Sequence, residues 1–203
     1  MGYSPTVIDA KELIQLNSYV YGSTTTVPAG WVVIGTAFDH DSGFKAVAYR
    51  NNLDPSRIAV AIAGTQFSSG GTLDTDGAVL GNNFPQRYNA ELQKFLAAIT
   101  VDLPRDLQIA ITGHSLGGFG VQLGVPYLVD QGFTNAYGVT FGALGAANVA
   151  SEAGLSSPLS SYSPYILNIV NAGDPIATLK TQIGQVVQIG EQGPIWRLLV
   201  CCP

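Results

Sequence analysis

The segment Gly113-His-Ser-Leu-Gly117 holds the residues of this sequence that are best suited to covalent chemistry. It matches the pattern G-x-S-x-G, in which a serine on a sharp turn between a strand and a helix presents its hydroxyl as a nucleophile. The flanking glycines are needed because a Cβ on either side would collide with the turn. We therefore predict that Ser115 is a catalytic nucleophile and that the backbone amide of Leu116 faces the position of an oxyanion.

Two further residues follow strand-like segments elsewhere in the chain. Thr65 comes shortly after the apolar run 58–63, which is typical of a strand covered on both faces. Its backbone amide and its hydroxyl are candidate second oxyanion donors, and an ordinary turn is the alternative. Asp174 also follows a β-prone segment. Two strand-and-crossover units of about 30 residues each separate it from Ser115, which predicts that both lie at the same carboxyl edge of a parallel sheet. We predict that Asp174 orients a catalytic base; an ordinary turn with Pro175 is the alternative.

Histidine is the usual partner of a nucleophilic serine, and the sequence contains only His40 and His114. His40 lies in a polar, glycine-containing loop between two β-prone segments, and we interpret it as a solvated loop residue. His114 directly precedes the nucleophile, and on such a turn its side chain should point away from the Ser115 hydroxyl, into packing or a supporting hydrogen bond. The sequence therefore does not identify a general base.

The elements that must position these residues alternate between helical and strand-like patterns, which predicts an α/β fold with a mostly parallel sheet. An antiparallel hairpin precedes the parallel strands. In the helix after Ser115, Pro126 should bend or shorten the helix. The expected helices cover residues 9–22, 88–99 and 119–129, and the expected strands cover residues 31–38, 44–50, 58–63, 107–111, 137–141, 165–170 and 185–189.

The segment Phe67 to Pro85 is rich in glycine and small polar residues and poor in helical periodicity. We predict that it is a loop or a mobile cover beside the strand that leads to Thr65. Such a lid would control access to an apolar cleft.

Composition limits the class of protein further. The 203 residues are enough for one domain with a sizeable core, and 46% are hydrophobic while only 11% are charged. A net charge of -5 with scattered basic residues argues against nucleic-acid binding. The only cysteines, Cys201 and Cys202, are adjacent and cannot staple a fold. We expect no metal ion and no cofactor.

No N-terminal signal peptide or membrane-spanning stretch is evident, so we expect a cytoplasmic protein or one exported by a signal not present in this chain. The sequence does not determine the oligomeric state.

Three motifs, in this order and at these intervals, resemble the fungal-type (class 3) triacylglycerol lipases and their bacterial relatives. They are Ala63-Gly-Thr65, Gly113-His-Ser-Leu-Gly-Gly118 and Asn171-Ala-Gly-Asp-Pro175. The resemblance implies an α/β-hydrolase fold in three layers, Ser115 as nucleophile, Asp174 as triad acid, and Thr65 and Leu116 at the oxyanion hole. It also implies a triad histidine downstream of Asp174, which this sequence lacks.

We therefore expect a single lipase-like domain, residues 1–203, that lacks its C-terminal segment. The implied function is a serine carboxylic ester hydrolase that acts on lipid or small esters, with possible contact to a lipid–water interface. The alternative is a hydrolase-fold binding module without catalysis, because a fold alone does not confer chemistry.

Overall fold

The computed structural model describes residues 8–65, 74–75, 77–79, 81 and 83–190. Within these residues, seven strands form one mixed sheet in chain order. The first two pairs are antiparallel and every later pair is parallel, which confirms the predicted α/β fold. The strands are β1 (Trp31–Asp39), β2 (Phe44–Asn51), β3 (Arg57–Ile62), β4 (Gln108–His114), β5 (Ala136–Phe141), β6 (Ile166–Asn171) and β7 (Gln185–Ile189).

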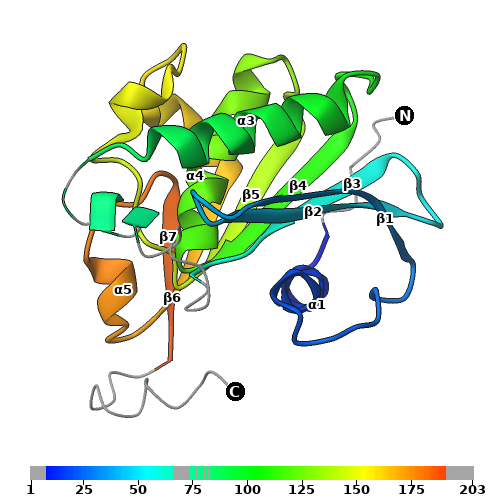
Figure 1. Cartoon of the computed structure of the whole chain (residues 1–203), viewed down its shortest axis with the longest axis horizontal. Helices are drawn as coiled ribbons and strands as arrows, with labels where there is room; N and C mark the ends of the chain where they lie inside the picture. The colour runs from blue at the N-terminus through cyan, green and yellow to red at the C-terminus, as the bar shows by residue number, and fades with distance from the viewer. Residues whose placement is uncertain (1–7, 66–73, 76, 80, 82, 191–203) are drawn as a thin grey trace.

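Helices cover both faces of this sheet (Figure 1). Helix α1 (Ala10–Tyr21) lies on one face, and α3 (Gln86–Thr100) and α4 (Leu116–Asp130) lie on the other, so the molecule has the expected three layers. The predicted ends of α1 are confirmed, since Asp9 caps its start and Gly22 ends it in a left-handed conformation. Between β5 and β7 lie three short elements: η1 (Ala150–Ala153), η2 (Leu159–Tyr165) and α5 (Pro175–Thr178).

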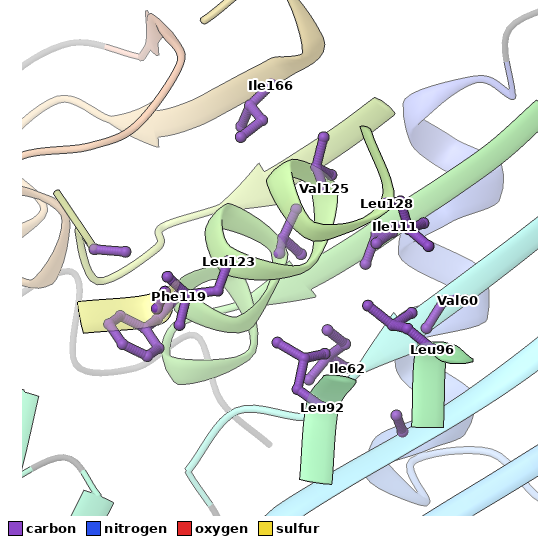
Figure 2. Packing of buried hydrophobic residues seen from close by; sticks show 14 of the residues in the cluster. Val60, Ile62, Leu92, Leu96, Ile111, Phe119, Leu123, Val125, Leu128 and Ile166 are labelled. Atoms are coloured by element: carbon purple, nitrogen blue, oxygen red, sulfur yellow. The ribbon is translucent and has the colours of Figure 1, made fainter. Parts of the chain in front are cut away.

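The sheet separates two hydrophobic clusters, and β3 contributes to both. Val60 and Ile62 pack with α3 and α4, whereas Ala59 and Ala61 belong to the cluster beneath α1. Figure 2 shows the first cluster, in which Leu92 of α3 lies beside Ile62. Because β3 and β4 are buried on both faces, their sequences are apolar runs without alternation.

The structure corrects two expectations about local structure. Helix α4 continues past Pro126 to Asp130, so the proline does not shorten it, and the bend that was the other expectation stays a prediction. The helix is buried along almost its whole length, and this packing compensates for the hydrogen bond that a proline cannot donate.

The second correction concerns the predicted lid segment, 67–85. Residues 74, 75 and 77–79 have helical backbone, so the prediction of a loop is wrong there. Thr75 and Val79, four positions apart, are both buried. Their burial in the tertiary structure outweighs the weak helical pattern of the segment. Residues 66–73, 76, 80 and 82 lie outside the described residues, and with them most of the predicted cover.

Candidate active site

Ser115 occupies the junction between β4, which ends at His114, and α4, which begins at Leu116. Its backbone has φ 54° and ψ -123°, and it is the only non-glycine residue with positive φ in the part of the chain that the structure describes. Such a conformation is costly for a residue with a Cβ, and strain of this kind concentrates at functional sites. The strand, strained turn and helix that the serine motif predicts are therefore present.

The two glycines of the motif allow this turn to pack against its neighbours. A Cβ on Gly113 would overlap the backbone of Gly117 and lie 2.8 Å from the amide nitrogen of Gly118. A Cβ on Gly117 would overlap the carbonyl oxygen of Ile62 and lie 2.9 Å from the carbonyl carbon of Ala63. The predicted collision with the turn is confirmed at Gly113, and Gly117 additionally lets α4 approach the end of β3.

That approach brings the loop after β3 to the nucleophile. A Cβ on Gly64 would lie 3.3 Å from the Cβ of Ser115, and Thr65 is the next residue. Leu116 is fully buried as the first residue of α4, where backbone amides have no partner within the helix. The structure thus brings Thr65 and Leu116 to the same end of the sheet as Ser115.

Asp174 reaches this end of the sheet from the opposite side. Its Oδ1 accepts a hydrogen bond of 2.9 Å from the amide of Ile176 and so caps α5. Its Oδ2 lies 2.8 Å from the position that a Cβ on Gly142 would take. Gly142 follows β5, and the preceding Phe141 accepts a hydrogen bond of 3.2 Å from the amide of Ser115. The aspartate is therefore part of a turn, as in the simpler interpretation, and also lies at the predicted carboxyl edge.

The His114 ring lies between the two sides of the site. Its Nδ1 is 3.4 Å from the hydroxyl of Tyr21, and its Nε2 is 3.8 Å from the same point beside Gly142 that Asp174 approaches. Desolvation lowers the pKa of His114, and the Asp174 carboxylate opposes this by favouring the charged ring. Because the pKa lies below its ordinary value, the imidazole is neutral at neutral pH. The supporting hydrogen bond predicted for His114 is present, with the Tyr21 hydroxyl as its partner.

His40 lies in the hairpin between β1 and β2, and 69% of its side chain is exposed, as predicted. Among the described residues, no group of three or more His, Cys, Asp or Glu side chains is placed to hold a metal ion. No helix in these residues is both long and apolar enough to cross a bilayer.

A model of the class 3 lipase family matches residues 59–183, which is more than half of the chain. The chain belongs to the class 3 lipase family. The matched region begins in β3 and ends before β7, so it includes Thr65, Ser115 and Asp174. A search of curated proteins finds no match.

Solved structures of fungal proteins share the fold of this chain. A triacylglycerol lipase from Penicillium expansum is 14% identical, with a TM-score of 0.54 over 88% of this chain and 76% of its own. MDLA from Penicillium cyclopium, in a mutant form, is also 14% identical, with a TM-score of 0.54 over 91% and 82%. A Rhizomucor miehei lipase in a propeptide complex is 18% identical, with a TM-score of 0.51 over 83% of this chain and 62% of its own. The chain thus spans less than two thirds of the Rhizomucor miehei protein.

Two features of the site are not indicated by the sequence. The first is Tyr21, the last residue of α1, whose hydroxyl accepts a hydrogen bond of 2.6 Å from the amide of Gly64. The sequence indicates only that Tyr21 lies on the packed face of a helix. Its partner is 43 residues away, and no local pattern reveals the contact.

The second feature is a pair of hydrogen-bonded side-chain amides, those of the buried Gln122 and the partly buried Gln182. Gln122 of α4 is fully buried, and its Nε2 donates to Gln182 Oε1 at 2.8 Å, while its Oε1 accepts from the amide of Ile183 at 2.7 Å. Gln182 in turn donates to the carbonyl oxygen of Ala177 in α5 at 3.1 Å. These bonds join the helix behind Ser115 to the short helix that Asp174 caps. A lone glutamine within an apolar helix was the available signal.

Proposed function

We propose that this chain is a serine carboxylic ester hydrolase of lipase or esterase type that acts on lipid-like acyl esters. The observation that carries the proposal is the strained Ser115 turn between β4 and α4, because such strain persists only where the surrounding structure enforces it. Membership of the class 3 lipase family supports the class of reaction and the class of substrate.

In the proposed reaction, the Ser115 hydroxyl oxygen attacks the ester carbonyl carbon and its proton passes to a base. The amides of Leu116 and Thr65 stabilise the resulting oxyanion. Collapse of the tetrahedral intermediate expels the alcohol, which takes up the proton and leaves an acyl-serine ester. Water then attacks the acyl carbonyl, which releases the carboxylic acid and restores the serine. Asp174 orients the base and stabilises its protonated form.

In this proposal, neither of the two histidines acts as the base. His40 lies in the β1–β2 hairpin, and the Nδ1 of His114 contacts the Tyr21 hydroxyl behind the turn. A carboxylate such as Asp174 is too weak a base to activate a serine hydroxyl at neutral pH. We therefore use added imidazole as the base in the test below, with Asp174 as its partner. Loss of the histidine in serine hydrolases costs about 10⁶ in turnover, while binding and the oxyanion hole retain roughly 10³ to 10⁴ over water.

The test is hydrolysis of a short-chain p-nitrophenyl ester by the purified chain, with and without added imidazole. We expect slow turnover that imidazole raises, and we expect Ser115→Ala to abolish it while the matched surface variant Ser18→Ala retains it. Asp174→Asn should weaken the effect of imidazole. Turnover by Ser115→Ala above the rate of the same imidazole solution without protein would contradict the proposal. A folded chain whose serine is neither acylated nor active with imidazole would favour the binding module instead.

A further inference from the structure

The loop that carries Thr65 leaves the sheet directly after β3. The amide of Ala63 still donates to the carbonyl oxygen of Lys45 on β2, at 2.9 Å. The next amide, that of Gly64, donates instead to the Tyr21 hydroxyl at 2.6 Å. A side chain from α1 thus provides the hydrogen-bond acceptor at the point where the hydrogen bonds of the sheet end.

The Tyr21 hydroxyl also reaches the other wall of the turn. Its oxygen lies 3.3 Å from the carbonyl oxygen of His114 and 3.4 Å from His114 Nδ1. A phenol has one proton to donate; the carbonyl oxygen of His114 can only accept, whereas Nδ1 accepts or donates according to the tautomer of the ring. Whichever of them receives the proton, the hydroxyl connects Gly64 to the end of β4.

The space around this hydroxyl is filled closely. A Cβ on Gly64 would overlap the Tyr21 hydroxyl and lie 2.6 Å from the His114 carbonyl oxygen, so only glycine fits between them. A small displacement of the hydroxyl would therefore move the Gly64 backbone relative to Ser115. Backbone donors in an oxyanion hole must be placed to within a few tenths of an ångström to be effective.

We propose that Tyr21 is a positioning residue, which fixes the Gly64–Thr65 loop against the nucleophile turn so that the Thr65 amide faces the oxyanion. The inference rests on the proposed function of Ser115. In this proposal the two amides of the loop have different roles: the Gly64 amide donates to Tyr21, and the Thr65 amide donates to the oxyanion.

The variant Tyr21→Phe removes one oxygen atom and tests this directly in the full chain. We expect the Gly64 amide to exchange with solvent at least about tenfold faster by NMR, because its acceptor is lost. Acylation of Ser115 by a p-nitrophenyl ester should become about tenfold slower, with little change in KM. In the infrared spectrum, the carbonyl stretch of the acyl-serine should move to higher frequency as its hydrogen bonds weaken.

Tyr137→Phe is the matched control. The Tyr137 hydroxyl accepts a hydrogen bond of 2.8 Å from the amide of Ile8, so the variant loses the same kind of bond beside the same helix without touching the loop. We expect it to leave Gly64 exchange, acylation and the carbonyl frequency unchanged. Equal effects of the two variants would reduce Tyr21 to a general stabilising role and overturn the inference.

Different results would contradict the role of Tyr21 and the role of Ser115. Unchanged Gly64 exchange and acylation in Tyr21→Phe would overturn the role of Tyr21 and leave Ser115 as the nucleophile. A wild-type chain that the ester does not acylate would overturn the nucleophile and with it the oxyanion role. Gly64 exchange, measured also in Ser115→Ala, does not depend on acylation and keeps the two outcomes apart.

Discussion

The oxyanion side of the nucleophile turn (Gly64, Thr65 and Leu116) and its acid side (Gly142, Asp174 and Gln182) are held by different physical means. On the oxyanion side, backbones approach so closely that Gly117 has no room for a Cβ against Ile62. On the acid side, hydrogen bonds of the buried Gln122 and the partly buried Gln182, to each other and to backbone groups, join α4 to α5.

The strands near the two sides also differ in their burial. β3 and β4 are almost fully buried, whereas every residue of β7 is exposed, including Val186, Val187 and Ile189. A steric contact between backbones cannot relax, so a single added methyl group displaces whole elements. A hydrogen-bonded network loses stability one bond at a time. The comparison predicts a graded order of mutational effects.

The largest effect is expected at the helix start on the oxyanion side. Gly117→Ala should lower the free energy of unfolding by more than about 4 kcal/mol, because the new Cβ meets the β3 backbone rather than a flexible side chain. Gly77→Ala is the matched control: its Cβ meets nothing within 4 Å and its backbone is helical, so it should be neutral or stabilising by up to about 1 kcal/mol. Urea denaturation measures the free energy of unfolding of both variants. Comparable stabilities would show that steric contact does not hold the oxyanion side.

Next in size is the buried amide on the acid side. Gln122→Met keeps the length of the side chain but leaves the amides of Ala146 and Ile183 without their acceptor, at a cost of about 3 kcal/mol. Gln93→Met, which loses one partly buried bond to the carbonyl oxygen of Ala153, should cost less than about 1 kcal/mol. If chemical denaturation finds the two variants equally stable, the amide pair does not hold the acid side.

A smaller effect separates two buried threonines on adjacent strands. Thr140 of β5 donates a hydrogen bond of 2.8 Å to Asn168, whereas the hydroxyl of Thr112 on β4 has no partner among the described residues. Thr140→Val should therefore cost about 1 to 2 kcal/mol, while Thr112→Val should be neutral or stabilising. The difference in thermal unfolding between these isosteric changes is the measurement. An equal loss at both positions would contradict it.

The smallest effect concerns His114, where the two sides meet. Its pKa should lie below the ordinary value of 6.5 in an NMR titration, because desolvation disfavours the charged ring. Since the unfolded chain then binds the proton more readily, stability should fall as the pH drops below 6.5. Asp174→Asn should lower the pKa of His114 further, because the carboxylate favours the charged ring. His114→Gln serves to assign the signal, and an unchanged pKa of His114 in Asp174→Asn would show that the two groups do not interact.

Much of the fold could be predicted from patterns that are local in the chain. The apolar runs that became β3 and β4, and the capped helix between Asp9 and Gly22, form where expected because short-range periodicity and capping decide them. The helical backbone at residues 74, 75 and 77–79 was not predicted, since the burial of Thr75 and Val79 depends on contacts distant in the chain, such as the hydrogen bond from Thr75 to the carbonyl oxygen of Ser42.

For the candidate site, the sequence by itself determined the Gly113–Gly117 turn, since the strand, the strained serine and the helix start lie within one short segment. It also placed Asp174 at the same edge, because parallel strands present their carboxyl ends together. Tertiary structure alone decided the contacts of Tyr21 with Gly64 and of Gln122 with Ile183, which join residues 43 and 61 positions apart. Such contacts arise only when separate layers pack, and neither periodicity nor capping encodes them.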